Sequence, residues 1–514
     1  MYLTQGLHRA MQQNPDGIMT IFGNRTRTFA QVIDRVARLA DGLHRLGVSS
    51  GSRVGILALN SDRYHEYLLA VPWADAVVNP VNIRWSAAEI AYSLMDSDTT
   101  VLFVDDAFVP LVPAIREAAP TLHTIIYCGD GPAPVGTHAY EELIATGLSI
   151  PDASRSDDSI AGIFYTGGTT GHPKGVALSH ANLATSALGA LAAGFVLEPG
   201  ARFLHAAPMF HLAALGGWYG QLILGGTHVI IPAFDPVATL RAIEQHQTTV
   251  SLLVPVMIQL LVDHPQVADH DLSSMQTIVY GASPIAEAVL KRAMTVFPQA
   301  GFVQAYGMTE LSPIATLLSP DDHRAGRLRS AGRAAPHSEV RIVDPDGNDV
   351  PRGTVGEITV RGGNVMLFYW NKPDETAATI RNGWLYTGDG GYIDEDGYLY
   401  ISDRIKDMIV SGGENVYSVE VENALASHPA VAACAVIGVP DPHWGERVHA
   451  VVACRAGATL ELADARAHLK DLIAGYKAPR SLDIVDELPV SGAGKILKRE
   501  LRRRYWSDTG RQVH

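Results

Sequence analysis

Glycine, threonine and lysine residues gather in one short segment whose composition suits the binding of a chain of phosphates. The segment reads YTGGTTGHPKGV over residues 165–176 and directly follows an apolar run at 160–164. Glycine lacks a side chain and tolerates positive φ angles, so successive backbone N–H groups can face an anion. Threonine hydroxyls add donors, and a lysine adds positive charge. The candidate phosphate-binding residues are Thr166, Gly167, Gly168, Thr169, Thr170, Gly171 and Lys174.

This segment differs from the P-loop of many nucleotide-binding proteins. The P-loop pattern requires Gly-Lys followed by Ser or Thr, whereas Pro173, Lys174 and Gly175 stand here. A plain surface turn is the alternative interpretation. The density of glycine, threonine and lysine favours a polyphosphate site.

Two further residues have side chains and surroundings suited to chemistry. Asp389 ends the run GWLYTGD, and a carboxylate there can accept hydrogen bonds from both hydroxyls of a ribose. Lys495 lies in the glycine-flanked sequence SGAGK, which can project an ammonium group far from the protein scaffold. A lone lysine in such a loop would otherwise be solvent-exposed and without a role.

Six more sequence blocks follow the Gly/Thr segment in order. They are PMFH at 208–211, YGASP at 280–284, QAYGMTE at 304–310, GWLYTGD at 383–389, SDRIKDMIVSGGENVY at 402–417 and PVSGAGKILKREL at 489–501. Through these blocks the sequence resembles the adenylate-forming superfamily, which includes acyl-CoA synthetases, aryl-CoA ligases, firefly luciferase and peptide-synthetase adenylation domains. The ordered blocks span residues 165–501, and the preceding part is compatible in pattern.

The resemblance implies a first step in which a carboxylate attacks the α-phosphorus of ATP and pyrophosphate leaves. Such chemistry depends on positioning and on neutralising developing charge. Glu310 would hold Mg²⁺ together with Thr170, and Thr309 would contact phosphate. Lys495 would reach the carboxylate and the α-phosphate, while His211 would stand beside the acyl carboxylate as a gate. The implied nucleotide-binding set further includes Gly281, Ala282, Ser283, Tyr306, Gly307, Met308, Thr309, Asp389, Ile401 and Arg404.

The implied second step is capture of the acyl adenylate by the thiol of CoA. A small C-terminal domain would rotate at Lys406 and withdraw Lys495, which is a gating motion. Three residues depart from the family pattern. Ser418 replaces a usual proline and is expected to loosen its loop, Gly167 replaces a usual serine, and Phe368 replaces a common glycine and is expected to narrow a nearby channel. The implied CoA-binding residues are Ser411, Gly412, Gly413, Arg447 and Lys477.

The residues after His211 bear on the acid. The run AALGGWYGQLILGG is apolar and glycine-rich, with no acidic residue to hold an amine and no arginine to hold a second carboxylate. Asp235 is nearby in sequence, but it is predicted to cap a helix that starts at Pro236. The pattern therefore disfavours amino acids and dicarboxylates and favours an apolar acid.

The resulting hypothesis is an AMP-forming acyl-CoA synthetase, an acid–thiol ligase that acts on a medium- or long-chain fatty acid. Alternatives that stay open are an aryl-acid ligase for cinnamic- or ferulic-type acids, an acyl-AMP donor to a carrier protein, and a luciferase-like oxygenase. A catalytically silent adenylate sensor is disfavoured by the presence of Lys495, Glu310 and Thr309. The expected small molecules are the carboxylic acid, ATP, Mg²⁺ and CoA.

Short apolar runs alternate with helix-length segments through the first part of the chain. Thr28 and Gln31 form a capping box before an apolar helical repeat that ends at Gly47, and the run 54–59 follows as a buried strand. This alternation predicts an α/β fold with a largely parallel sheet. The runs VRIVDPDGNDVP and GYIDEDGYLYI read as strand, turn and strand, which predicts a β-rich subdomain after residue 340.

The last hundred or so residues predict a small α+β domain, with a helix at 419–427, strands at 431–439 and 448–454 and a helix at 462–474. We expect an N-terminal adenylation domain over 1–403, a hinge at 404–406 and a mobile C-terminal domain over 407–514. The resemblance is also compatible with a homodimer.

Composition excludes several classes of function. Of 514 residues, 47% are hydrophobic and 18% charged, which supports packed cores and gives no case for disorder. The net charge of −14 offers no footprint for nucleic acid. Three cysteines without CxxC spacing form neither a disulfide framework nor a thiolate zinc site. The absence of an apolar leader and of about 18 consecutive apolar residues predicts no transmembrane segment and a cytoplasmic location.

Overall fold

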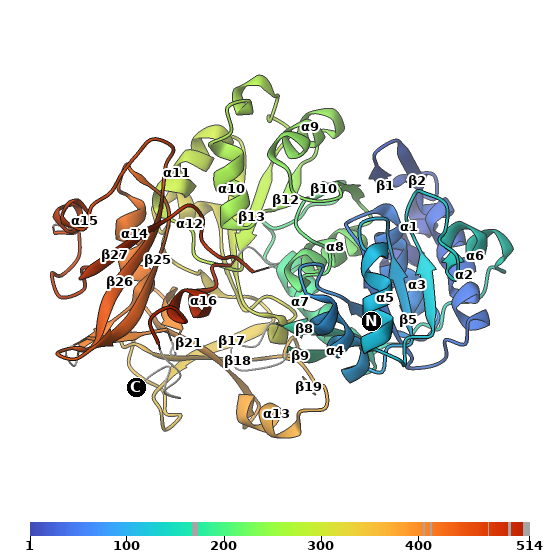
Figure 1. Cartoon of the computed structure of the whole chain (residues 1–514). Coiled ribbons are helices and arrows are strands. Elements are labelled where there is room, and N and C mark those ends of the chain that lie inside the picture. The colour runs from blue at the N-terminus through green and yellow to red at the C-terminus, as the bar shows by residue number, and fades with distance from the viewer. Residues whose placement is uncertain (167–172, 405–406, 412–413, 471, 492–494, 507–514) are drawn as a thin grey trace.

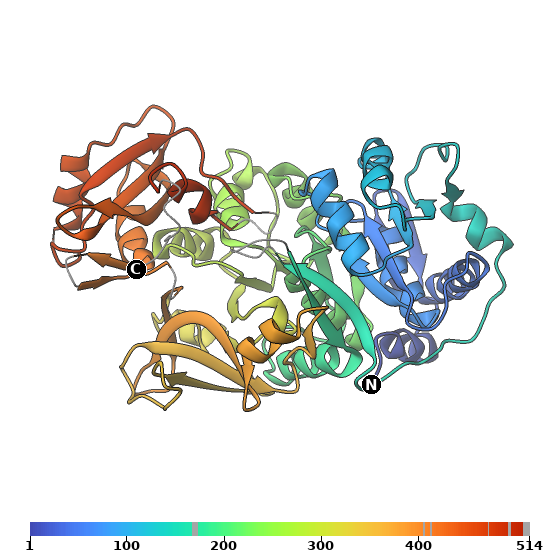
Figure 2. The same cartoon turned by 60° about the horizontal axis from the view of Figure 1, so that its bottom comes forward.

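The computed structural model describes residues 1–166, 173–404, 407–411, 414–470, 472–491 and 495–506. Within these residues the chain forms four sheets. Figure 1 shows the earliest α/β part and the C-terminal part at opposite ends of the molecule, and Figure 2 shows the same separation after rotation. The intervening chain joins them.

The first sheet has the order β19-β9-β8-β4-β3-β5-β6-β7 and is parallel from β8 to β7. Two antiparallel strands extend it beyond β8. The strands are β3 (Arg53–Leu57), β4 (Val77–Pro80), β5 (Val101–Val104), β6 (Thr124–Tyr127), β7 (His138–Ala139), β8 (Ile160–Thr166), β9 (Lys174–Ser179) and β19 (Phe368–Tyr369). The accompanying helices are α2 (Phe29–Arg45), α3 (Asp62–Trp73), α4 (Ala87–Asp96), α5 (Val112–Ala118) and α6 (Tyr140–Thr146), with the 3₁₀ turn η1 (Val109–Leu111).

The second sheet has the order β16-β15-β14-β13-β12-β10-β11-β1-β2 and is parallel from β14 to β1. Its strands are β1 (Ile18–Phe22), β2 (Arg25–Thr28), β10 (Arg202–His205), β11 (Thr227–Ile230), β12 (Val250–Leu252), β13 (Thr277–Gly281), β14 (Gly301–Tyr306), β15 (Thr316–Leu318) and β16 (Arg333–Ala334). The helices are α1 (Gln5–Gln13), α7 (His180–Ala192), α8 (Leu212–Leu224), α9 (Pro236–His246), α10 (Pro255–Val262), α11 (Glu287–Val296) and α12 (Pro320–Arg324), with η2 (Val267–Asp269) and η3 (Thr309–Leu311).

The third sheet is antiparallel and supplies the predicted β-rich part. It contains β17 (Ser338–Val343), β18 (Gly356–Gly362), β20 (Ile380–Arg381), β21 (Trp384–Ile393) and β22 (Leu399–Arg404), with helix α13 (Pro373–Thr379) alongside. The hairpin predicted from GYIDEDGYLYI is confirmed as β21 and β22. After the other predicted turn, at 344–349, the chain forms only an isolated bridge, and the next strand begins at Gly356.

The C-terminal part is α+β, as the sequence predicts. Its sheet contains β23 (Ile409–Ser411), β24 (Glu414–Val416), β25 (Val431–Asp441), β26 (Gly445–Cys454) and β27 (Ser481–Val485), with helices α14 (Ser418–Ala426), α15 (Leu462–Leu469) and α16 (Lys498–Arg502). Helix α15 ends at Leu469, five residues before the expected 474.

Local sequence signals explain several helix starts. The Thr28 side chain accepts from the Gln31 N–H and the Gln31 side chain accepts from the Thr28 N–H, which confirms the capping box. Asp235 accepts from the Ala238 N–H with Pro236 at the first helical position, so its predicted structural role is confirmed. In the described part of the chain, no helix is long and apolar enough to cross a membrane.

Candidate active site

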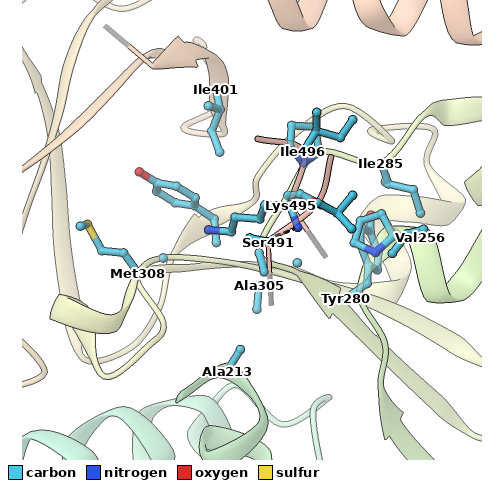
Figure 3. Close-up of a pocket in the computed structure, with 18 of the residues that line it drawn as sticks. Ala213, Val256, Tyr280, Ile285, Ala305, Met308, Ile401, Ser491, Lys495 and Ile496 are labelled. Carbon is cyan, nitrogen blue, oxygen red and sulfur yellow. Dashed lines mark hydrogen bonds between the residues drawn. The ribbon is translucent and has the colours of Figure 1, made fainter. Parts of the chain in front are cut away.

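A cavity of about 1940 Å³ lies where the second and third sheets, helices α7 and α8 and the C-terminal part meet. Its walls bring together most of the described residues predicted to bind nucleotide. Figure 3 shows Lys495 within it, extended toward Met308 and away from Ile285. Met308 and Lys495, which are 187 positions apart in the sequence, therefore line the same cavity.

Neighbouring ends of two parallel strands form one wall. Gly281 ends β13 and pairs in register with Ala305 of β14. A Cβ on Gly281 would lie 2.1 Å from the Ala305 carbonyl oxygen, so no other residue fits. Ala282 follows with φ +66°, and Ser283 continues the same cavity wall. The tight turn exposes backbone where the sequence predicted an adenine slot.

The block after β14 continues this wall. Gly307 also stands where a side chain is excluded, because its Cβ would lie 2.1 Å from the Pro313 carbonyl oxygen. Met308 and Thr309 then line the cavity, and Thr309 begins the turn η3.

Tyr306 and Asp389 join the second and third sheets. The Tyr306 hydroxyl donates to Oδ2 of Asp389 at 2.9 Å. Asp389 on β21 lies opposite Arg404 on β22, and Ile401 of β22 also lines the cavity. The structure thus brings the proposed ribose carboxylate beside the proposed adenine wall.

Glu310 presents a buried carboxylate, 5% exposed, to the cavity. Its Oε1 accepts a 2.8 Å hydrogen bond from the hydroxyl of Tyr369. Burial, then the nearby Glu310 charge, raises the pKa of Tyr369, so this hydroxyl stays protonated and remains a donor. No group of three or more His, Cys, Asp or Glu able to hold a metal occurs among the described residues. A lone carboxylate fits Mg²⁺ that is otherwise held by phosphates and water.

The described edges of the Gly/Thr segment reach the same cavity. Thr166 ends β8 and lies opposite Lys174, which begins β9. Lys174 pairs with Glu375 of α13, and its Nζ lies 4.9 Å from the centre of the Tyr369 ring. The predicted residues Gly167, Gly168, Thr169, Thr170 and Gly171 lie outside the described residues.

His211 is the N-cap of α8 and lines the same cavity as Lys495. Its Nδ1 accepts from the Ala213 N–H at 3.3 Å, which assigns the neutral ring proton to Nε2. Burial, with a smaller contribution from the positive charge of Lys495, lowers the pKa of His211 to about 4. His211 is therefore a neutral donor near pH 7.

The Lys495 segment is fixed by its own turn and by the large domain. Ser491 N–H donates to the Lys495 carbonyl at 2.6 Å, and the Lys495 N–H donates to Ser491 Oγ at 3.1 Å. Arg84 donates to the Ser491 carbonyl at 3.0 Å. A second link joins Gln259 to the carbonyl of Ala432 at 2.9 Å. These contacts hold the small C-terminal part against the cavity.

An apolar branch of the cavity runs along α8. Ala213, Gly216 and Gly220 share one face of this helix and line the branch. Leu197 packs next to Gly220: a Cβ added to Gly220 would lie 3.0 Å from Leu197 Cδ1. The remaining lining residues of this branch include Ala187, Ala190, Leu191, Val196, Phe203, Leu252, Val279 and Ile314.

The residues predicted to bind CoA are more scattered. Lys477 lines the cavity and pairs with Glu420 at 2.8 Å. Ser411 on β23 and Arg447 on β26 are not among the cavity-lining residues, and Arg447 lies 3.8 Å from Asp441. The predicted hinge residue Lys406, with Gly412, Gly413 and the side chain of Arg404, lies outside the described part.

Two of the departures from the family pattern have structural consequences that differ from expectation. Phe368 forms strand β19 opposite Ala177 and is not among the described cavity-lining residues. Ser418 does not loosen its loop, because its N–H and hydroxyl both donate to Asp403.

Sequence reasoning missed Tyr369, Arg84 and the α7 wall of the apolar branch. Tyr369 directly follows Phe368, and the alternation of side chains along a strand would have placed it on the opposite face. The α7 residues carry only an apolar helix pattern, which is also typical of ordinary core.

Comparison with known proteins gives consistent matches over the chain. A family model described as AMP-binding enzyme matches residues 7–370, and one described as AMP-binding enzyme C-terminal domain matches residues 420–495.

Individual relatives cover nearly the whole chain. It is 41% identical to a feruloyl-CoA synthase of Amycolatopsis sp over 97% of this chain and 98% of that protein. It is 36% identical to the fatty acid–[acyl-carrier-protein] ligase ScoC of Streptomyces coeruleorubidus, over 98% of this chain and 96% of that one. Its fold matches the anthranilate CoA ligase AuaEII in complex with anthranoyl-AMP with a TM-score of 0.92 and 28% identity, over 98% and 97% of the two chains.

Proposed function

Because this chain belongs to the AMP-binding enzyme family, we propose that its cavity activates an apolar carboxylic acid of moderate length with ATP and transfers the acyl group to CoA. The chain is an acid–thiol ligase of the AMP-forming type. The observation that carries the proposal is that Lys495, Glu310 and the apolar branch beside α8 share one cavity.

Adenylation requires the acid carboxylate to meet the α-phosphorus in line. We assign His211 to hold the carboxylate, since its neutral ring carries a proton on Nε2. Lys495 would neutralise charge shared between the attacking oxygen and the α-phosphate. Thr309, Thr166 and Lys174 would contact the phosphates, together with the Gly/Thr segment. Proximity and charge neutralisation then supply most of the rate.

The nucleoside would bind against β13 and β14. Gly281, Ala282, Ser283, Gly307 and Met308 form its backbone-rich wall. Asp389, oriented by Tyr306, would accept the ribose hydroxyls, with Ile401 and Arg404 beside it.

Glu310 is the proposed protein ligand of Mg²⁺, with Thr170 as a second. When bound, the ion would neutralise phosphate oxygens. Tyr369 keeps the Glu310 carboxylate in one orientation.

The apolar branch limits the length of the acid. Ala213 and Gly220 are seven positions apart on α8, which spans about 10 Å at 1.5 Å per residue. An extended chain advances about 1.2 Å per bond, so this length accommodates about eight bonds beyond the carboxylate. A fatty acid of about eight to ten carbons and an arylpropenoic acid both meet this limit. The named activities of the feruloyl-CoA synthase and ScoC favour the same two classes.

The CoA acceptor is proposed to approach after the C-terminal part rotates. The proposal includes the predicted domain boundaries, 1–403, 404–406 and 407–514, with Lys406 as the hinge residue. Lys477, Ser411, Gly412, Gly413 and Arg447 are the proposed CoA contacts. The homodimer and the cytoplasmic location also stay predictions.

The deciding experiment measures pyrophosphate release by the full chain with ATP and Mg²⁺, with and without CoA. The acids are butyrate, octanoate, decanoate, palmitate, cinnamate, ferulate and benzoate. We expect multiple turnovers only with CoA and the highest kcat/KM for octanoate, decanoate or cinnamate. Turnover with a phosphopantetheinyl carrier protein but not with CoA, or a preference for palmitate, would contradict the proposal.

A further inference from the structure

A buried hydrogen-bond cluster links the third sheet to the C-terminal part, directly across residues 404–406. Asp403 lies on β22, next to Gly390 of β21, and Ser418 is the first residue of α14. The Ser418 N–H donates to Asp403 Oδ2 at 2.6 Å, and its hydroxyl donates to the same oxygen at 2.5 Å. Asp403 is 4% exposed and Ser418 is 0% exposed.

Lys498 of α16 completes the cluster. Its Nζ donates to Ser418 Oγ and lies 2.8 Å from Oε1 of Glu422. Glu422 also accepts from the Val436 N–H at 2.7 Å. Separating Asp403 from Ser418 removes two hydrogen bonds to a buried carboxylate, which has a free-energy cost.

The cluster is connected to the segment that carries Lys495. Lys498 follows Lys495 by three positions, and the N–H of Leu497, which lies between them, donates to the Pro489 carbonyl at 2.8 Å. The arrangement in which Asp403 contacts Ser418 is therefore the arrangement in which Lys495 lies in the cavity. A rotation at the proposed hinge would shift Ser418 and Lys498 relative to Asp403, because Asp403 is paired with Gly390 of β21.

We propose that Ser418 is a positioning residue which, with Asp403 and Lys498, forms a latch that stabilises the adenylation arrangement and sets the relative rates of acyl-AMP formation and acyl transfer. This inference rests on the proposed two-step function. The latch is selective because it is present in one arrangement of the domains and broken in the other.

Ser418 offers a clean test because it occupies the first helical position. Proline is tolerated there, so Ser418→Pro keeps the helix while it removes both the N–H and the hydroxyl. Ser418→Ala removes the hydroxyl alone. Ser427→Ala is the matched control, since the Ser427 hydroxyl donates to Ala424 at the other end of α14, away from the cluster.

The experiment measures the two half-reactions separately on the full chain, with octanoate or cinnamate as the acid. Single-turnover pyrophosphate release reports adenylation, and addition of CoA to preformed acyl-AMP enzyme reports transfer. We expect Ser418→Pro to slow adenylation about fivefold to twentyfold while transfer is unchanged or faster, with Ser418→Ala intermediate and Ser427→Ala like the wild type. Equal loss in both steps, or no change in either, would overturn the latch.

A second readout does not depend on catalysis. A fluorophore pair, one on each side of residues 404–406, reports the population of the adenylation arrangement. We expect Ser418→Pro to reduce that population, and an unchanged population would contradict the inference. If the wild type releases no pyrophosphate with any acid, the proposed function fails while this measurement still decides the latch.

Discussion

The hydroxyl of Tyr369 donates a 2.8 Å hydrogen bond to Oε1 of the buried Glu310 carboxylate. Strand β19 belongs to the first sheet. It thereby orients a carboxylate on η3, the turn that follows β14 of the second sheet. Because Lys174 also lies against the Tyr369 ring, one side chain contacts both a proposed metal ligand and a proposed phosphate contact.

Removing this hydroxyl should weaken the proposed Mg²⁺ site. In Tyr369→Phe the Glu310 carboxylate loses its orienting donor, and we expect the Mg²⁺ concentration for half-maximal pyrophosphate release to rise about tenfold or more. Trp370→Phe, next to it on the chain, is the control. An unchanged Mg²⁺ dependence in Tyr369→Phe would show that Tyr369 does not orient Glu310 for Mg²⁺ binding.

Replacing Lys495 tests its catalytic assignment. In Lys495→Ala we expect pyrophosphate release to fall by about a hundredfold or more, because a positive charge beside the reacting oxygens is lost. ATP binding, measured by calorimetry, should stay within a few fold of the wild type. Lys470→Ala, at an exposed position, is the control. Unchanged pyrophosphate release in Lys495→Ala would defeat the assignment.

Blocking the apolar branch should change chain-length preference. In Gly220→Val the new side chain enters the space next to Leu197, so we expect kcat/KM for decanoate to fall at least tenfold. Butyrate, which does not reach this depth, should be unaffected and serves as the internal control. Equal losses for both acids would indicate general damage to the fold instead.

Acid should destabilise the protein through three buried histidines. His65, His205 and His228 form a contact cluster in which the His205 Nε2 to His228 Nδ1 distance is 2.9 Å. Burial lowers the pKa of His65 and of His205 to about 3, and that of His228 as well. Their ordinary pKa is about 6.5, so below that pH the unfolded chain binds protons that the folded chain does not.

The free energy of unfolding should therefore fall as pH drops from about 6.5 toward 3, by about 2 kcal/mol per histidine at pH 5. Urea unfolding at pH 7.5 and pH 5 measures this difference. In His205→Phe the difference should shrink by about 2 kcal/mol, whereas the exposed control His123→Gln should match the wild type. Identical pH dependence in His205→Phe would contradict the prediction.

Signals that act over a few residues were predictable from the sequence. The capping box at Thr28 and Gln31 and the N-cap at Asp235 are confirmed because both depend on hydrogen bonds within one turn. The α/β class, the C-terminal α+β part and the resemblance to adenylate-forming enzymes are likewise confirmed.

Contacts between distant segments were not predictable. Ser418 was expected to loosen its loop because it replaces a usual proline. The sequence does not reveal that β22 brings Asp403 to the start of α14, where it accepts a hydrogen bond from Ser418. The α7 wall carries no polar signal, and only tertiary packing distinguishes a helix face that lines a cavity from one in a filled core. The individual roles of the site residues stay predictions.

Helix α8 separates two demands that a catalyst must meet. His211 at its start is proposed to hold the reacting carboxylate, while Gly216 and Gly220, further along the helix, line the apolar branch proposed to hold the rest of the acid. If this assignment holds, substitutions at the later positions should alter which acid is accepted without disturbing ATP or the chemical step. Changes of substrate during evolution, or in a library restricted to this helix face, need few mutations and leave the nucleotide machinery intact.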